Sequence, residues 1–63
     1  MSIRQARERI GLSQIELAQA VGVSQGAISQ WEKGLTHPSF KVLRTLARVL
    51  NTTIDEIVGE ESA

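Results

Sequence analysis

Residues 17–28 read LAQAVGVSQGAI, and this stretch decides the fold. Ala18 is small where two helices would cross closely, and Gly22 follows four residues later, where the first helix should end. Val23 would then fill the turn as an apolar plug, and Ser24 would cap the next helix. The spacing predicts two helices at a wide angle, joined by a short turn that contains glycine, which is a helix-turn-helix.

Helix-start and helix-stop residues recur along the chain of 63 residues. Ser2, Ser13 and Thr53 are each followed three residues later by glutamine or glutamate, the capping-box pattern that satisfies free amides at a helix start. Glycines fall where helices should end, at positions 11, 22, 34 and 59. No alternating β-branched run predicts a strand. We therefore expect a single all-α domain over residues 1–63, with five helices at about residues 2–10, 14–21, 25–33, 40–50 and 54–58.

The expected helix over residues 40–50 has the clearest two-sided pattern. Its apolar residues fall on one side and are expected to face the core; they are Phe40, Leu43, Leu46, Ala47 and Leu50. Its cations fall on the opposite side; they are Lys41, Arg44 and Arg48. This stripe is either a solvated face or a set of phosphate contacts, and the same two interpretations apply to Arg4, Arg7 and Arg9. Trp31 is expected in the core beside Ile28, whereas Ile15 lies off the buried side of its helix. Ile15 is either a contact for a partner or a lone apolar residue on the surface, and we favour the second interpretation.

The outer face of the expected helix over residues 25–33 differs from an ordinary solvated face. Gln25, Ser29 and Lys33 form a row at i, i+4 and i+8, with Gly26 and Gln30 beside it. A solvated face usually carries glutamate and lysine, whereas this face presents amides, a hydroxyl and little bulk. The pattern favours a face that reads another molecule; the alternative is that Gln25 is simply a tolerated helix-start residue.

The formal net charge is zero, but the charges are unevenly distributed. Residues 1–51 hold all seven cations and three acids, a net charge of +4, whereas residues 52–63 hold four acids and no cation. Such asymmetry fits an anion-binding body with a remote acidic end at about residues 59–63. It fits an ordinary solvated tail equally well.

Several classes of protein are disfavoured by the composition. Cysteine is absent and His37, the single histidine, has no acidic or histidine partner at ligand spacing, so we expect no metal and no cofactor. No apolar run approaches the ~20 residues of a membrane span, which favours a cytoplasmic protein without membrane contact. Catalysis is not expected, because no nucleophile lies beside a base and a small helical chain leaves little room for a cleft.

The sequence resembles the lambda-repressor/Cro-like family, also called the xenobiotic-response-element family of helix-turn-helix regulators. The matching segments cover nearly the whole chain; they are residues 11–14 (GLSQ), 16–18 (ELA), 21–24 (VGVS), 28–29 (IS), 31–34 (WEKG), 38–39 (PS), 46–47 (LA), 50–51 (LN) and 55–57 (DEI). The resemblance implies a compact five-helix domain whose helix-turn-helix covers about residues 14–33. It also implies that the third helix enters the major groove of DNA.

The resemblance further implies which side chains meet DNA. We expect base contacts from the outer face of the third helix, at Gln25, Gly26, Ser29 and Gln30. We expect phosphate contacts from the helix starts and nearby cations, at Gln14, Ser24, Lys33, Lys41 and Arg44. A glutamine amide can bond an adenine at N6 and N7, and a helix N-terminus presents amides to phosphate. Residues 35–39 offer only His37, so strong minor-groove contact is not expected there.

We therefore predict a sequence-specific transcriptional regulator of double-stranded DNA, and a repressor rather than an activator. Two-fold symmetric operators imply a homodimer, which could form only on DNA because the chain has few spare apolar residues. The alternative is a protein-interaction module of the same fold, such as an antitoxin or adaptor that binds a partner protein. No small-molecule ligand is expected.

Overall fold

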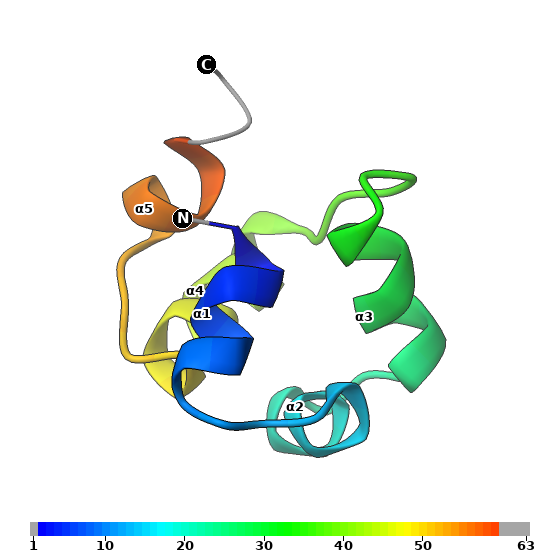
Figure 1. Ribbon diagram of the computed structural model, residues 1–63. Coiled ribbons are helices and arrows are strands. Elements are labelled where there is room, and N and C mark those ends of the chain that lie inside the picture. Colours follow the sequence, from blue (N-terminus) through cyan, green and yellow to red (C-terminus); the bar gives the residue numbers. More distant parts are fainter. Residues whose placement is uncertain (1, 60–63) are drawn as a thin grey trace.

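Residues 2–59, the part of the chain that the computed structural model describes, form five helices and no strand. The helices are α1 (Ile3–Arg9), α2 (Gln14–Val21), α3 (Gln25–Glu32), α4 (Phe40–Val49) and α5 (Ile54–Gly59) (Figure 1). The all-α prediction is confirmed, and each expected helix end lies within one residue of the observed end. None of these helices is long and apolar enough to cross a membrane. Most of the expected acidic end, residues 60–63, lies outside the described residues.

Serine side chains begin four of the five helices. The hydroxyl oxygens of Ser2, Ser13, Ser24 and Ser39 each accept a hydrogen bond from the backbone N–H three residues later, at 3.0–3.3 Å. At the first two helix starts, the Gln5 and Glu16 side chains return the bond to the serine N–H, which completes the predicted capping boxes. The Thr53 hydroxyl likewise accepts from the Glu56 N–H at the start of α5. Each cap of this kind stabilises a helix by about 1 kcal/mol.

A glycine with positive φ follows three of the five helices, and the ends of α4 and α5 differ. Gly11, Gly22 and Gly34 have positive φ angles, as the sequence predicts for helix stops. Gly59 is instead the last residue of α5, so the predicted stop at that position is wrong by one residue. The stop after α4 comes from Asn51, whose φ of 55° lies in the left-handed region that asparagine tolerates better than most residues.

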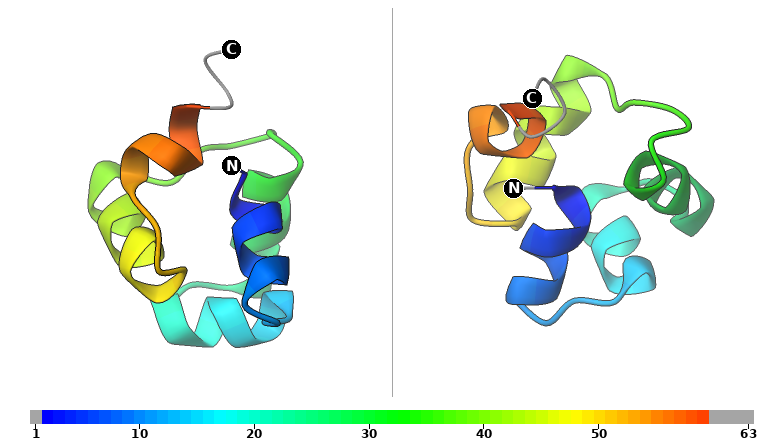
Figure 2. Two further views of the ribbon diagram at one scale, coloured as in Figure 1. Left: turned by 60° about the vertical axis from the view of Figure 1, so that its left-hand side comes forward. Right: turned by 45° about the horizontal axis from the view of Figure 1, so that its top comes forward.

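The core lies where the five helices meet. Its largest fully buried side chains come from α2, α3 and the end of α4; they are Leu17, Ile28, Leu46 and Leu50. Helix α2 packs against both α3 and α4. Helix α1 packs against α3, and α5 packs against α4. Two further views of the ribbon show the helices grouped around a common centre (Figure 2). Trp31 faces inward as expected, although it is half-buried and packs against the core rather than inside it.

Phe40 departs from the predicted core. Its side chain is 66% exposed, although the helical pattern groups it with the buried Leu46 and Leu50. The reason is its place as the first residue of α4: side chains tilt toward the N-terminus of their helix, so this one projects past the helix end. The cationic stripe is exposed on α4 as predicted, and Ile15 is exposed on α2.

A partly buried ion pair joins α1 to the last turn of α3, and the sequence analysis did not predict it. Arg7 Nε and Nη2 donate to the two carboxylate oxygens of Glu32, at 2.7 and 3.1 Å. The side chains are 11% and 6% exposed. Arg7 Nη1 also donates to the Leu12 carbonyl at 2.8 Å, so the same guanidinium holds the loop between α1 and α2.

The protonation of Glu32 reflects these contacts. Burial alone would raise the pKa of the carboxyl group, but hydrogen bonds from Arg7 and Gln14 and the charge of Arg7 outweigh it and lower the pKa. The hydrogen bond to Glu32 also raises the pKa of Arg7. Both groups are therefore ionised at neutral pH.

This pair should make the folded state sensitive to acid. Because the folded-state pKa of Glu32 lies below its ordinary value of 4.5, its stabilisation is complete above that value and is lost as the pH falls through the folded pKa. We expect the free energy of unfolding, measured by urea titration with circular dichroism, to fall as the pH drops below the ordinary carboxyl pKa of 4.5. In Glu32→Gln, stability should be lower at pH 7 and should fall less on acidification.

Glu16 supplies the control, because the N–H and side chain of Ser13 lower the pKa of this fully exposed carboxylate too. Glu16→Gln removes that local contribution and leaves the ion pair intact. Equal acid dependence in wild type and Glu32→Gln would contradict the assignment of the acid response to the ion pair.

Candidate nucleic-acid interface

The turn between α2 and α3 has the predicted geometry. Gly22 ends α2 with a φ of 86°, and its N–H donates to the Ala18 carbonyl at 2.8 Å. The Val23 N–H donates to the same carbonyl at 3.0 Å, and the Val23 side chain packs against the core. Ser24 then begins α3. The turn therefore places α3 at one edge of the molecule, as Figure 1 and the right-hand view of Figure 2 show.

The predicted base-reading residues lie along α3. Gln25, Gly26 and Gln30 are exposed, and Ser29 is half-buried. The Gln30 side-chain oxygen accepts a hydrogen bond from the Thr36 hydroxyl at 3.4 Å. The exposed surface of α3 is thus made of amides, a hydroxyl and a glycine. That these residues read bases stays a prediction.

Gly26 is not required by the fold. A Cβ atom at this position would meet only the Ser24 hydroxyl, at 3.8 Å, and Gly26 is not among the described glycines with positive φ. Alanine would therefore fit, and it would favour the helix by about 1 kcal/mol. A glycine that neither packing nor backbone demands is consistent with a surface that another molecule approaches closely.

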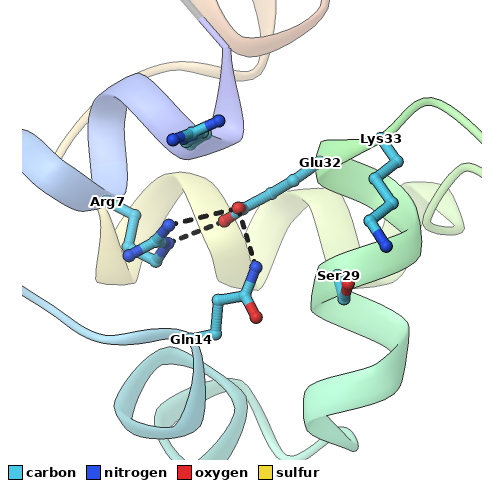
Figure 3. A pocket seen from close by; sticks show the side chains of 6 residues that line it. Arg7, Gln14, Ser29, Glu32 and Lys33 are labelled. Carbon is cyan, nitrogen blue, oxygen red and sulfur yellow. Dashed lines mark hydrogen bonds and ion pairs between the residues drawn. The ribbon is translucent and has the colours of Figure 1, made fainter.

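The starts of α2 and α3 are joined by their first side chains. Gln14 Nε2 donates to Glu32 Oε1 at 3.0 Å, and Gln25 Nε2 donates to Gln14 Oε1 at 3.2 Å. Together with the ion pair, these bonds form a continuous chain from Arg7 through Glu32 and Gln14 to Gln25, part of which is shown in Figure 3. The sequence analysis placed Gln14 and Gln25 at one interface, and the structure brings them into contact.

A polar cavity of about 270 Å³ lies beside this chain of hydrogen bonds. Its lining comes from α1, α2 and the end of α3; the residues are Arg4, Arg7, Gln14, Ser29, Glu32 and Lys33 (Figure 3). Three cations face one carboxylate there, so the lining carries an excess of positive charge. Lys33 is the exposed C-cap residue of α3, at the position where a phosphate contact is predicted.

Of the remaining predicted phosphate-contacting residues, Gln14 also lines this cavity, whereas Ser24, Lys41 and Arg44 lie outside it. Ser24 uses its hydroxyl oxygen to cap α3. Lys41 and Arg44 are exposed on α4, which packs against α2 and α5. Their contacts with phosphate stay predictions. No group of three histidine, cysteine or acidic residues that could hold a metal occurs within residues 2–59.

Arg7 and Glu32 are the residues of the site that sequence reasoning missed, although a signal was present. Arg7 lies four residues after the buried Ile3, and Glu32 lies four residues after the buried Ile28. Each charge therefore falls on the apolar side of its helix. A cation and an acid on two buried helix faces predict a pair, because neither is tolerated there alone.

Comparison with known proteins identifies the family to which this chain belongs. Residues 3–57 match the model of a helix-turn-helix family. The HTH-type transcriptional activator BcrR of Enterococcus faecalis is 38% identical over 60 residues, which are 94% of this chain but 29% of BcrR. The chain thus spans less than a third of that relative's length.

Two solved structures have the same fold. The DNA-binding domain of the P22 C2 repressor superposes with a TM-score of 0.80 at 40% identity, over 84% of this chain and 70% of that domain. A chain of the SinR protein/SinI protein complex superposes with a TM-score of 0.84 at 33% identity, over 94% of this chain and 58% of the other. The sequence match over most of the chain and the two superpositions agree. This chain belongs to the helix-turn-helix family of the lambda-repressor/Cro type.

Proposed function

We propose that this chain is a transcriptional regulator that binds double-stranded DNA sequence-specifically, with α3 in the major groove. One observation carries the proposal: the exposed side of α3 presents amides and a glycine that the fold does not need, and it begins at a glutamine already held by a second glutamine. A major groove admits an α-helix, and base edges there present both donors and acceptors.

The comparisons support this function and leave the direction of regulation open. The P22 C2 domain is named as a repressor's DNA-binding domain and BcrR as an activator. We favour repression, because a domain that occupies the groove can exclude polymerase without further parts. A reporter gene downstream of the selected site distinguishes the two directions.

Base reading is tested at Gln25. A bidentate glutamine–adenine contact contributes about 1–3 kcal/mol of discrimination, so Gln25→Ala should weaken binding to the preferred site by that amount. Binding to scrambled DNA should change little, because phosphate contacts supply non-specific affinity. The measurement is a pair of titrations at one salt concentration, on a site selected from a random DNA pool.

Gln19→Ala is the matched control, since Gln19 is an exposed glutamine on α2 away from the helix start. Circular dichroism should show both variants folded. Equal losses on both DNAs would make Gln25 a positioning contact, and no loss on either would remove α3 from the interface.

Phosphate contact is tested at Lys33. Each phosphate neutralised by a cation contributes about −0.9 to the slope of log affinity against log salt. Lys33→Ala should therefore make the slope shallower by about one and leave the ratio of affinities for preferred and scrambled sites unchanged. Arg48→Ala, which removes an exposed cation at the end of α4, should leave the slope as it is. A slope unaffected by Lys33→Ala would exclude Lys33 from the interface.

We further propose that two copies bind one operator. Two helix-turn-helix units on one face of DNA lie about 34 Å apart, which is close to the 28 × 22 × 20 Å extents of this domain. Neighbouring copies would then come near each other on DNA. Leu35, in the segment between α3 and α4, and Phe40, the first residue of α4, are 69% and 66% exposed and supply apolar surface for that contact.

Sedimentation on a palindromic site tests this arrangement. Wild type should form a complex of two chains per DNA with cooperative binding, and Phe40→Ala should reduce the cooperativity because the second copy loses apolar contact. Ile15→Ala, which alters a 54% exposed residue on α2, is the control. A stable complex with one chain on a palindromic site would contradict the two-copy proposal.

A protein partner is the second candidate function, favoured by the superposition on a chain of the SinR protein/SinI protein complex. It need not exclude DNA binding. A domain that binds neither selected nor random DNA at low salt, yet remains folded, would favour this candidate.

A further inference from the structure

The polar cavity beside the Arg7–Glu32 pair is large enough to hold a small ligand. Its volume of about 270 Å³ is several times the ~30 Å³ that one water molecule occupies in the liquid, and it approaches the lower end of small-molecule sites, about 300 Å³. The lining comes from α1, α2 and the end of α3 (Figure 3). The chemistry of this lining indicates which class of ligand the cavity can bind.

The single carboxylate in the lining is already engaged. Glu32 Oε2 accepts from Arg7 Nε at 2.7 Å, and Oε1 accepts from Arg7 Nη2 at 3.1 Å and from Gln14 Nε2 at 3.0 Å. The Glu32 side chain is also only 6% exposed. Because Arg7 balances its charge and these bonds occupy its oxygens, this carboxylate does little to attract a cation.

The unengaged polar groups of the lining are hydrogen-bond donors. Within residues 2–59, the side chains of Ser29 and Lys33 make no hydrogen bond or ion pair. They lie four residues apart on one face of α3, and Figure 3 shows both side chains on the cavity side of that helix. Arg4 binds Glu8 through Nε alone, at 3.3 Å, so its two Nη groups are available. An ammonium, a guanidinium and a hydroxyl thus line one space.

Charge complementarity distinguishes the anions that fit. The Arg7–Glu32 pair contributes no net charge, and the two remaining cations, Arg4 and Lys33, give the lining a charge of +2. The contact of Arg4 with Glu8 offsets little of this, because exposed ion pairs are weak. A DNA phosphodiester carries one negative charge, whereas a terminal phosphate carries about −1.5 to −2 at pH 7. The terminal phosphate is therefore the better match.

We propose that this cavity binds a small molecule with a terminal phosphate, and that the bound ligand competes with DNA. Ser29 is a predicted base contact and Lys33 a predicted phosphate contact, so a ligand held by both occupies part of the proposed interface. The competition rests on the proposed function, whereas binding of the ligand does not. The sequence analysis expected no small-molecule ligand, because a cavity formed by three helices is not visible in the pattern of any one of them.

The first experiment measures ligand binding without DNA. Methyl phosphate, which is mainly a dianion at about pH 7.5, is titrated into the isotope-labelled protein at constant ionic strength and followed by amide NMR spectra. The shifts should saturate and should be largest around Arg4, Ser29 and Lys33. Dimethyl phosphate, a monoanion with the chemistry of the DNA backbone, should bind at least about threefold more weakly.

Three matched variants locate the site. Arg4→Gln and Lys33→Gln each remove one cation from the lining and should weaken methyl phosphate binding by at least about threefold. Arg48→Gln removes the same charge from an exposed residue at the end of α4, outside the cavity, and should leave the affinity unchanged. Circular dichroism checks that all three variants are folded. Equal weakening in all three would reveal only a general attraction of anions and would overturn the cavity site.

The second experiment measures competition on the selected DNA site. A ligand that binds only the DNA-free protein lowers the apparent affinity for DNA by one plus the ratio of its concentration to its Kd. Methyl phosphate at ten times its Kd should therefore weaken DNA binding about tenfold at constant ionic strength. The same concentration should weaken the binding of Lys33→Gln by about fourfold or less, because this variant holds the ligand less tightly.

The outcomes separate this inference from the proposed function. Shifts that do not saturate, or dimethyl phosphate that binds as tightly as methyl phosphate, would overturn the ligand site. Saturating shifts with an unchanged affinity for DNA would overturn the competition. A protein that binds methyl phosphate but neither selected nor random DNA would contradict the proposed function and support the ligand site.

Discussion

Arg7 and Glu32 lie at the junction of α1 and α3, where water reaches little of either charge. Withdrawing an ion from water costs several kcal/mol, and a buried pair repays this cost only when its geometry is good and its remaining polar atoms are bonded. Both conditions hold: the pair is bidentate, and the Leu12 carbonyl and the Gln14 amide take up further bonds. No buried side-chain polar atom in residues 2–59 is left without a partner. The end of α3 is therefore fixed relative to α1 and to the loop before α2.

The same carboxylate connects the core to the surface that we propose for DNA. Helix α3 is short, and its packing side is carried largely by Ile28 and the half-buried Trp31. Apolar contacts of this kind set the depth of a helix but say little about its rotation or about its side-chain amides. The hydrogen bonds from Glu32 to Gln14 and from Gln14 to Gln25 supply that missing constraint. A stabilising contact and a recognition contact thus share one residue.

The features that the sequence predicted correctly depend on residues that are close together in the chain. Capping serines and positive-φ glycines act within a few residues, so the helix bounds follow from the pattern alone. What it missed depends on distance in the sequence or on position within an element. The Arg7–Glu32 pair spans 25 residues; helical periodicity places each charge on the apolar side of its helix but does not show that these two sides meet. Phe40 has the right phase for burial but lies at the end of its helix, where phase no longer decides exposure.

The charge of this chain bears on why the hydrogen bond between Gln14 and Gln25 matters. Affinity for DNA of any sequence rises with the number of phosphates that cations neutralise, and here the net charge is zero with two exposed cations, Arg4 and Lys33, beside the polar cavity. In the proposed complex, sequence discrimination would come from base contacts, because phosphate contacts carry no sequence information. Ordering a flexible side chain on binding costs about 0.5–1.5 kcal/mol, a large part of what one such contact contributes. Because Gln25 is already held by Gln14, most of that cost would be incurred in folding rather than in the DNA binding that we propose.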